Sequence, residues 1–458
     1  MRQPRKVGHL AVVGSVALIA AACGSPSTSS SSSSSGATSQ AIGGSLNVWA
    51  EWTAAEQKDF LAALQPFETQ TGITINYLGK GSNMSTALSA AIQGGSPPDV
   101  ALVPDPGTLQ TLAKAGTIKD LTSILGGLSS NYGSAWNTLA TVNGKIYGVW
   151  FKGANKNTIW YNPAEFATAG ITSPPTTWEQ LVSDAGQLKA AGITPLSLCT
   201  DVGWPLADFW QNVYLKTAGA DSYNKLVTHA IKWTDPTVTQ AFTTMAQLVG
   251  QPSYLAGGLA GSLSNPFPDC VNKVFPKPPS QPTAAMVIEA DFVTSQITSN
   301  STTYSPGNTG TGGAACSTDP AATPCYNFFA FPPPAADSAN VGAIQGAGDV
   351  ALMPKDSPGA EALIKYLAGP NGASIWAHLG GFASPNKSVP SSSYPDPVAQ
   401  ADAKALVNAS SFVFSLDDLQ GSWEKSMWQD LINFVKDPTS VSTVEAAMDT
   451  QATAALGH

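Results

Sequence analysis

Ser45-Leu46-Asn47-Val48-Trp49, followed by Thr53-Ala54-Ala55-Glu56, is the first strand-and-helix pattern of the chain and indicates its fold class. The first five residues are strand-like, and Thr53 with Glu56 three positions later makes a capping box, which starts helices. Gly72 predicts the end of this helix, and Pro66 predicts a bend or an early end. The apolar face predicted for the helix consists of Phe60, Leu61, Leu64 and Phe67.

The same order of strand and helix repeats along the next stretch of chain. Strands are predicted at 73–77 and 99–103, with helices at 85–93 and 109–115. The run Val100-Ala101-Leu102-Val103 is continuously apolar, as expected of a strand that is covered on both faces. Repeated βα units predict an α/β lobe built around a mostly parallel sheet.

A second region of the same kind follows. Thr177-Trp178-Glu179-Gln180 is another capping box, and its helix is predicted to end at Gly192. The sequence therefore predicts a second α/β lobe. Its remaining predicted segments are strands at 147–151, 158–161, 193–198 and 341–353, and helical stretches at 204–245, 361–379 and 423–455.

The N-terminal segment has the layout of an exported lipoprotein. Basic residues precede a short apolar run, and small residues come just before Cys23. This order is typical of a secretory signal peptide, and the cysteine resembles that of a lipobox, with Ala20 in place of the usual leucine. We expect a signal peptide at 1–22, lipidation of Cys23 and a serine-rich tether at 23–41. The alternative is an ordinary secreted protein that is cleaved nearby.

Charge and length narrow the classes of function. The chain has 458 residues, a formal net charge of −9 and only 12% charged residues. It contains no basic run, which argues against nucleic acid as a partner, and no second long apolar segment. The length is ample for two lobes with cores of their own.

The cysteines after Cys23 predict disulfides. They form an even set in an exported protein, and four cysteines allow three pairings. Cys316 and Cys325 lie close together in a Gly/Thr/Pro-rich stretch, so we expect them to pair, and by default Cys199 pairs with Cys270. Metal binding is the weaker interpretation, because there is no CxxC and histidines are few. We expect neither a metal nor a cofactor.

The candidate ligand-binding residues follow the ends of predicted strands, because open α/β sheets bind ligands outside the carboxyl ends of their strands. These segments combine aromatic side chains with carboxylates or a cation, which suits a sugar. The C–H face of a pyranose packs on an aromatic ring, and its hydroxyls bond to charged groups. The residues are Glu51, Trp52, Asp105, Trp150, Lys152, Trp204 and Asp208, with Glu289 and Asp291 after a later strand-like run.

A structural role is the alternative for each of these residues. A single tryptophan is more often part of a core than of a ligand site. Asp208 is placed to cap the following helix, Asp105 to hold a turn, and Glu289 or Asp291 to lie on the surface. Catalytic signals are weak, because HExxH, GxSxG and P-loop motifs are missing from the sequence. A glycosidase, however, needs only two carboxylates and no such motif.

Short motifs recur in order across residues 42–458, and together they resemble the extracellular solute-binding proteins of ABC importers. The resemblance is to the sugar-binding branch related to maltose-binding protein. The motifs are Trp52-Thr53, Ser96-Pro97-Pro98-Asp99-Val100, Asn143-Gly144-Lys145-Ile146-Tyr147-Gly148-Val149-Trp150, Trp160-Tyr161-Asn162-Pro163, Pro175-Thr176-Thr177-Trp178-Glu179-Gln180-Leu181 and Gly380-Gly381-Phe382-Ala383-Ser384-Pro385.

A further set of motifs resembles the α-glucoside-binding lipoproteins of that branch. The chain departs from them at Glu289-Ala290-Asp291, where that subgroup usually has an aromatic residue or histidine and a basic residue, and in the added loop from Cys316 to Cys325. These departures leave an α-glucoside, another oligosaccharide and a polyol open. The motifs are Cys199, Gly203-Trp204-Pro205, Asp208-Phe209-Trp210, Lys232-Trp233-Thr234-Asp235-Pro236, Cys270, Ala347-Gly348-Asp349, Phe412-Val413-Phe414 and Asp417-Asp418-Leu419.

The resemblance implies a type II periplasmic-binding-protein fold, with two α/β lobes and the ligand in the cleft between them. Crossings between lobes are implied near 152–155, 332–336 and 380–383. Lobe 1 then comprises 42–152 plus 336–381, and lobe 2 comprises 153–335 plus 382–458. The resemblance adds Trp210, Gly348, Asp349, Gly381 and Phe382 to the candidate ligand-binding residues.

We therefore expect a monomeric sugar receptor, lipid-anchored to the outer face of the cell membrane. It closes around its carbohydrate and docks on the permease subunits of an ABC importer. No catalysis is expected. The alternatives are a secreted carbohydrate-active enzyme, a binding protein for a polyol or another small solute, and a surface scaffold.

Overall fold

The computed structural model describes residues 42–301, 304–307, 316, 324–420 and 423–457. The predicted signal peptide, Cys23 and the tether lie outside these residues. No helix in the described part of the chain is long and apolar enough to cross a membrane.

The first sheet has six strands in the order β13-β12-β3-β1-β2, with β6 also paired to β12. The predicted parallel pairing is present where β1 lies between β2 and β3. By contrast, β12 runs antiparallel to both β3 and β6. The strands are β1 (Ser45–Ala50), β2 (Thr74–Gly79), β3 (Val100–Val103), β6 (Val149–Asn155), β12 (Ala343–Leu352) and β13 (Ser411–Phe414).

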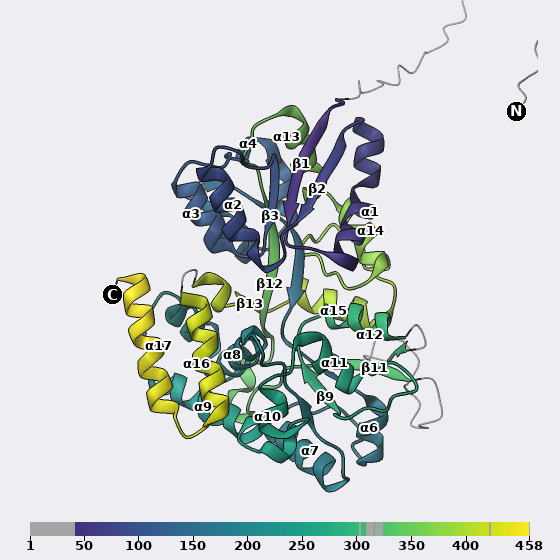
Figure 1. Ribbon diagram of the computed structural model, residues 1–458, viewed down its shortest axis with the longest axis vertical. Coiled ribbons are helices and arrows are strands. Elements are labelled where there is room, and N and C mark those ends of the chain that lie inside the picture. The colour runs from purple at the N-terminus through teal and green to yellow at the C-terminus, as the bar shows by residue number, and fades with distance from the viewer. Residues whose placement is uncertain (1–41, 302–303, 308–315, 317–323, 421–422, 458) are drawn as a thin grey trace, which may run out of the picture. The chain divides into compact units, whose positions relative to one another are not determined.

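Helices cover both faces of this sheet. Figure 1 shows α2 and α3 on one side of β1, β2 and β3, and α1 and α14 on the other. The helices are α1 (Ala54–Thr71), α2 (Met84–Gln93), α3 (Pro106–Lys114), α4 (Thr122–Leu125), α5 (Ser134–Leu139), α13 (Pro358–Ala368) and α14 (Pro370–Leu379), beside the short hairpin of β4 (Thr141–Val142) and β5 (Lys145–Ile146).

Of the three predictions made for helix α1, the stop at Gly72 is confirmed, and the effect of Pro66 and the capping box are not. It ends at Gly72, whose φ of 68° is the left-handed conformation that glycine adopts readily. Pro66 lies inside the helix, which continues to Thr71. The predicted capping box does not form, because Thr53 makes no side-chain cap and Glu56 bonds to Lys152 instead.

The second sheet has the order β10-β11-β7-β9-β8 and is mixed rather than mostly parallel. Strand β7 enters it directly from the first sheet and runs antiparallel to both β9 and β11. The chain passes from β6 to β7 without an intervening helix, so β7 is not placed by the βα connection that gives parallel strands. The strands are β7 (Thr158–Tyr161), β8 (Leu196–Ser197), β9 (Met286–Ile288), β10 (Ser305–Pro306) and β11 (Cys325–Ala330).

Most of the remaining helices surround this sheet and share a core of their own, whereas α15 packs on β6 and joins the first core through Ala403 and Leu406. The helical stretch predicted at 204–245 is two helices, α8 and α9, and α8 bends at Gly219, where φ is 79°. The helices are α6 (Pro163–Thr168), α7 (Trp178–Ala190), α8 (Trp204–Val227), α9 (Pro236–Val249), α10 (Gly258–Ser262), α11 (Phe267–Val274), α12 (Val293–Asn300), α15 (Pro397–Val407), α16 (Glu424–Lys436) and α17 (Val441–Leu456).

The long strand β12 belongs to the first sheet, and it also contacts helix α8, which packs beside the second sheet. One end of it, 350–352, pairs with β3, and the other end, 343–346, pairs with β13. The chain passes from the first sheet to the second between β6 and β7, and returns between β11 and β12. Near a third predicted crossing, Ala383 makes a β-bridge to Gly153. The lobe boundaries stay a prediction.

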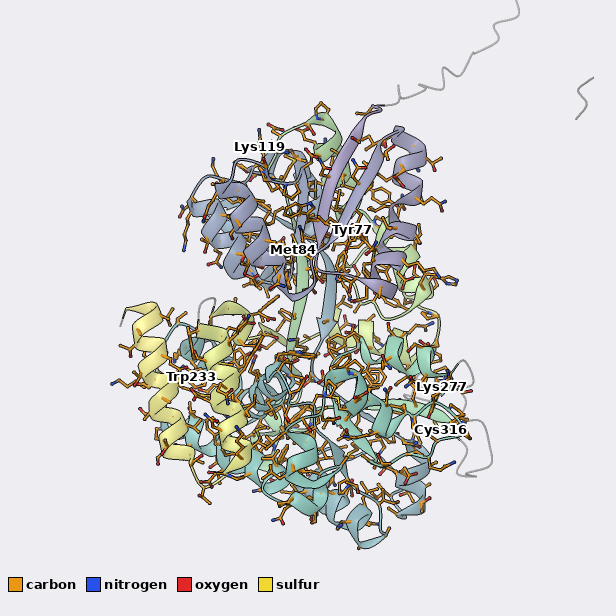
Figure 2. All side chains as sticks on the ribbon, viewed as in Figure 1. Tyr77, Met84, Lys119, Trp233, Lys277 and Cys316 are labelled. Carbon is orange, nitrogen blue, oxygen red and sulfur yellow. A yellow bond between two sulfur atoms is a disulfide. The ribbon has the colours of Figure 1, made fainter. Side chains whose placement is uncertain are left out.

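Both predicted disulfides are present, Cys199–Cys270 and Cys316–Cys325. The first joins the segment after β8 to α11, and the second holds Cys316 to the start of β11 (Figure 2).

Candidate functional site

Charged side chains from both sheets meet around Lys152 on β6. The ammonium Nζ of Lys152 lies 2.5 Å from Oε1 of Glu56, and its side chain is almost fully buried. It also lies 5.2 Å from the ring centre of Trp376 and 5.9 Å from that of Trp52. We call this group the Lys152 cluster; it comprises Lys152, Glu56, Glu51 after β1, Asp349 on β12, Asp291 after β9 and Asp402 on α15.

The electrostatics of the cluster are dominated by its carboxyl groups. Burial disfavours the charged form of Lys152, but Glu56, Asp349 and Asp291 outweigh that effect and raise its pKa. Burial raises the pKa of Asp291 to about 7 and that of Asp349 to about 6, although Lys152 opposes both shifts. The raised pKa values mean that Asp291 and Asp349 keep their protons up to a higher pH than they would in water.

Two carboxyl pairs flank Lys152. Asp349 lies beside Glu51, and burial together with Asp349 raises the pKa of Glu51 well above its ordinary value. Asp291 lies beside Asp402, whose pKa is raised by burial and by Asp291. Oδ1 of Asp402 accepts a hydrogen bond of 2.8 Å from Nδ2 of Asn155. The sequence did not single out Asp402, because nothing local in helix α15 marks it.

A second buried cation lies four residues further along the chain. Nζ of Lys156 is 2.8 Å from Oδ1 of Asp208 and 3.8 Å from Oδ2 of Asp418. Nε2 of Gln345, on β12, donates to the same Asp208 oxygen at 3.1 Å. We call this group the Lys156 cluster; it comprises Lys156, Asp208, Gln345, Asp417, Asp418 and Glu424.

The Lys156 cluster gives Asp208 its ion-pair partner. Asp208 is the member of this cluster that was predicted from the sequence as a ligand-binding candidate. Burial raises the pKa of Asp208 to about 6, against the opposing charge of Lys156. Lys156 follows a strand end, which is the signal used for the other candidates, but no aromatic residue stands beside it. Asp417 and Asp418 lie in one of the motifs that carry the family resemblance, and that motif is the sequence signal that could have identified them.

Trp204 packs on the residue that follows Asp291 in the chain, and the 381–382 segment lies beside Trp376. Trp204 begins α8 after Gly203, and its ring centre lies 5.9 Å from that of Phe292, the residue after Asp291. Phe382 packs on Trp376 at a ring distance of 5.1 Å. A Cβ atom on Gly381 would lie 1.7 Å from Oγ of Ser295 on α12, so only glycine lets this segment approach that helix so closely.

The remaining tryptophan candidates lie in the two cores. Trp52 packs edge-on against Phe60 and Trp376, close to Lys152. Trp150 donates from Nε1 to the backbone oxygen of Trp136 at 2.7 Å. Trp210 is fully buried and stacks on Tyr214 and Trp233. The structure therefore brings Trp52 to the Lys152 cluster, and it brings neither Trp150 nor Trp210 there.

Asp105 and Gly348 each have a role in the local structure. Oδ1 of Asp105 accepts from the backbone N–H of Thr108 at 2.6 Å and so caps α3. A Cβ atom on Gly348 would lie 2.6 Å from the backbone oxygen of Lys152, so the glycine lets β12 and β6 pair closely.

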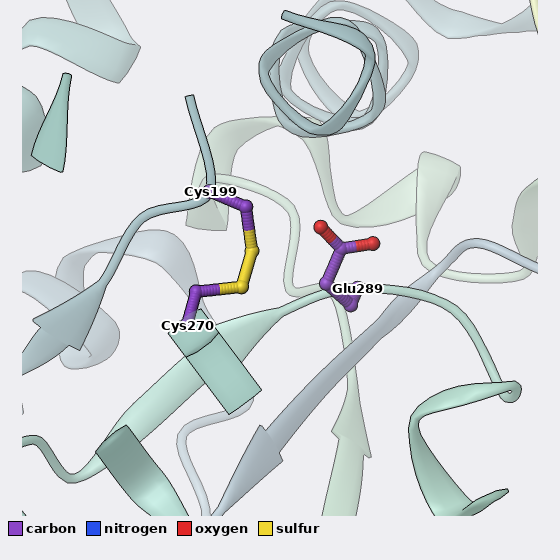
Figure 3. Close-up of side chains that lie close together, drawn as sticks. All are labelled: Cys199, Cys270 and Glu289. Carbon is purple, nitrogen blue, oxygen red and sulfur yellow. A yellow bond between two sulfur atoms is a disulfide. The ribbon is translucent and has the colours of Figure 1, made fainter. Parts of the chain in front are cut away.

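Glu289 is fully buried between the Lys156 cluster and the first disulfide. Figure 3 shows its carboxylate facing the Cys199–Cys270 bond, and its oxygen lies within 4.8 Å of the two sulfur atoms. Both sulfur atoms are committed to the disulfide and offer no thiolate to a metal. Burial raises the pKa of Glu289 well above its ordinary value, and Asp208 adds to the effect.

A small cavity in the second core is a separate feature. Its volume is about 10 Å³, and its lining includes Ile159, Leu181 and Met286. The space holds no solute larger than a water molecule, so the two charged clusters are the candidate site.

Comparison with known proteins places the chain among binding proteins. The profile of the bacterial extracellular solute-binding proteins matches residues 49–266. The osmoprotective compounds-binding protein GgtB of Synechocystis is 28% identical over 83% of this chain and 86% of its own length. The alpha-glucosides-binding periplasmic protein AglE of Rhizobium meliloti is 28% identical over 86% of this chain and 84% of its own length.

Solved structures share the fold. The bacterial solute receptor AcbH superposes with a TM-score of 0.76 at 18% identity, over 90% of this chain and 99% of that one. A chitin oligosaccharide binding protein gives a TM-score of 0.73 at 21% identity, over the same shares. The two-lobed type II α/β fold predicted from the sequence is thereby confirmed, and the chain belongs to the family of bacterial extracellular solute-binding proteins of ABC transporters.

Proposed function

We propose that this protein is the sugar receptor of an ABC importer, which takes up an oligosaccharide or glycoside and delivers it to a membrane permease. The observation that carries the proposal is the Lys152 cluster, where carboxyl groups from the surroundings of both sheets meet aromatic rings. Carboxyl groups bond to sugar hydroxyls, and the rings pack on the C–H faces. A ligand held by both lobes favours the closed form of the receptor.

The names of the relatives support this class of ligand. Two are described as binding osmoprotective compounds and alpha-glucosides, and another, in Streptomyces coelicolor, as binding diacetylchitobiose. An α-glucoside remains our proposed ligand, with a polyol as the alternative. We propose that the contacts come from Glu51, Trp52, Lys152, Trp204, Asp208, Glu289, Asp291, Asp349, Gly381 and Phe382.

The proposed place of work is the outer face of the cell membrane. Cys23 carries the lipid in this proposal, and the serine-rich stretch after it keeps a monomeric receptor within reach of its permease. Without such an anchor, an exported receptor is lost by diffusion wherever no outer barrier confines it.

A thermal-shift panel tests the proposal. The purified protein is melted with trehalose, sucrose, maltose, cellobiose and sorbitol, and each sugar is then recovered and analysed by chromatography. We expect at least one sugar to raise the melting temperature and to be recovered intact. Hydrolysis products that accumulate with time and with protein concentration would instead indicate a carbohydrate-active enzyme. A panel without any shift would count against a sugar ligand.

A further inference from the structure

The Lys152 cluster has more acid groups than its one ammonium can neutralise. Five carboxyl groups, those of Glu51, Glu56, Asp291, Asp349 and Asp402, surround the single ammonium of Lys152. The ammonium forms its ion pair with Glu56, at 2.5 Å. The other four carboxyl groups form the two pairs that flank it, Glu51 with Asp349 and Asp291 with Asp402.

Several polar atoms of the cluster are buried without a hydrogen bond of normal geometry. They include both side-chain oxygens of Asp291, one oxygen of Asp349 and Nε1 of Trp52. The side chains of Asp291 and Asp349 are each only 5% exposed. Buried polar groups are nearly always bonded, so these atoms point to a ligand that donates to the carboxylate oxygens and accepts from the indole N–H.

The other titratable groups that face the carboxyl pairs add no positive charge. Tyr394 lies near Asp291 and Asp402, and Tyr77 lies near Asp349 and the two glutamates. Asp59, on α1, adds a further acid within reach of Lys152. In the described residues, Lys152 is the cation that acts on both pairs.

From this arrangement we infer that the ligand carries a positive charge, and that it is an amino sugar whose ammonium lies between the two carboxyl pairs. The inference rests on the proposed function and narrows its substrate class. An ammonium donates to several carboxylates at once, and charge-assisted hydrogen bonds are about twice as strong as neutral ones. The rings of Trp52 and Trp376, which lie 5.9 Å and 5.2 Å from Nζ of Lys152 at the edge of the first core, also favour a cation at this place.

A neutral sugar would use the same groups differently. Four buried carboxylates repel one another, so a neutral ligand leaves some of them protonated. An ammonium stabilises the ionised form of each pair and drives the bound protons into solution. Proton release on binding therefore distinguishes the two classes of ligand, whatever the sugar ring contributes.

The test compares matched sugars by isothermal titration calorimetry. The pairs are trehalose with 2-amino-2-deoxytrehalose, and cellobiose with the β-1,4-linked disaccharide of glucosamine, at pH 7.0 and pH 4.5. At pH 7.0 we expect at least one amino sugar to bind about tenfold more tightly than its neutral partner, with proton release seen as a buffer-dependent heat. At pH 4.5, where the carboxyl groups are protonated, the preference shrinks to about threefold or less.

Two variants locate the effect. D291N and D349N each remove one negative charge and should reduce the preference for the amino sugar by about threefold or more. D221N removes the same charge at an exposed position on α8, whose side chain is 84% exposed, and leaves the preference unchanged. Proton release by the unaltered protein provides the same information if a variant does not fold.

Two results would overturn the inference. Neutral sugars that bind as tightly as their amino partners at pH 7.0 would refute the charged ligand and leave the sugar receptor standing. If neither member of either pair binds, and no sugar of the thermal-shift panel raises the melting temperature, the proposed function fails together with the inference.

Discussion

Lys156 is a buried charge whose partners are all supplied by the protein. Its ammonium bonds to Asp208 and lies near Asp418, and the acids raise its pKa although burial opposes them. Removing one partner of a buried ion pair leaves the other uncompensated, which costs far more than the pair itself contributes. We therefore expect the stability of the protein to depend on the presence of Lys156 and on the pH at which its carboxylate partners ionise.

We predict that K156M lowers the free energy of unfolding by about 3 kcal/mol at pH 8, because Asp208 and Asp418 are left buried without a cation. The loss is smaller at pH 5, where Asp208 takes up a proton. Urea unfolding at both pH values measures it. The control is K225M, which breaks the exposed pair with Asp221 and costs about 0.5 kcal/mol or less. Equal losses in the two variants would mean that Lys156 is not a structural charge.

Trp204 gives a prediction for binding. W204A should weaken the affinity for the sugar by about tenfold or more, because it removes a ring of the proposed site that packs on Phe292. Calorimetric titration measures the affinity, and the melting temperature checks the fold. W49A is the matched control, since Trp49 is also partly buried but packs under Lys80 at the end of β1. If W204A retains the full affinity, Trp204 is not part of the site.

Individual residues were predictable where a local signal marked them. Lys152 and Asp291 were marked by their places after predicted strands, and Asp349 by a motif of the family resemblance. The structure places all three in one cluster, with Lys152 inside β6 and Asp349 inside β12. Asp402 carries no such mark, and Lys156 follows a strand end but has no aromatic residue beside it in the sequence. The partners of both lie more than 50 positions away along the chain. Trp150 comes two residues before Lys152, and Trp210 two residues after Asp208, but their rings fill the two cores.

At the scale of elements, β12 is the strand on which the arrangement depends. It pairs with β3, β6 and β13, and contributes Gln345 to one cluster and Asp349 to the other. The close pairing with β6 requires the small residue Gly348, which faces the ring of Trp136 and the backbone of Lys152.

We predict that G348A destabilises the protein by about 2 kcal/mol, because the added methyl group overlaps the Lys152 backbone and β12 must shift. It should also weaken ligand binding, since Asp349 moves with the strand. Chemical denaturation and titration of the same sample measure both effects. G127A is the control, because open space surrounds a Cβ atom at that glycine. A G348A protein as stable as the G127A protein would show that the strands tolerate the methyl group.

The helix α1 shows why some local signals failed. The capping box at Thr53 was well formed in sequence, but its Glu56 bonds to Lys152, 96 positions further along the chain. A buried ammonium stabilises a carboxylate more than an exposed backbone N–H does, so the distant partner prevails. Gly72 and Gly192 face no such competition, and the helices α1 and α7 end next to them as predicted.

For the whole molecule, the buried carboxyl groups set the response to pH. Unfolded Asp and Glu side chains ionise near pH 4, whereas burial raises the pKa of Asp208 and Asp349 to about 6, of Asp291 to about 7 and of Glu424 to about 8. Between these values the folded state binds more protons than the unfolded state, so stability falls as pH rises.

We predict that the free energy of unfolding decreases by about 3 kcal/mol between pH 5 and pH 8. Lys216, whose pKa burial lowers to about 7, acts in the opposite direction, but it is one group against several. Urea unfolding at four pH values measures the trend, and the double variant D291N/D349N should flatten it. A stability that rises steadily over this range would contradict the burial of these acids.

The fold of the whole molecule was predictable because repeated βα units and ordered motifs extend over most of the chain. The two sheets follow from them. The two disulfides were predicted separately, from the even number of cysteines after Cys23 and the short separation of Cys316 from Cys325. The antiparallel entry of β7 was not predictable, because a short crossing between lobes leaves no pattern of its own. The convergence of acids around Lys152 was also hidden, since it brings together five separate elements.

Isothermal titration calorimetry on the purified protein shows directly whether it captures a sugar. With the sugar that gives the largest thermal shift, we predict saturable binding of one molecule per chain with a dissociation constant of about 1 μM, or about 8 kcal/mol. D349N should weaken it by about tenfold or more. Heats that do not saturate with any sugar or amino sugar at millimolar concentration would contradict sugar capture.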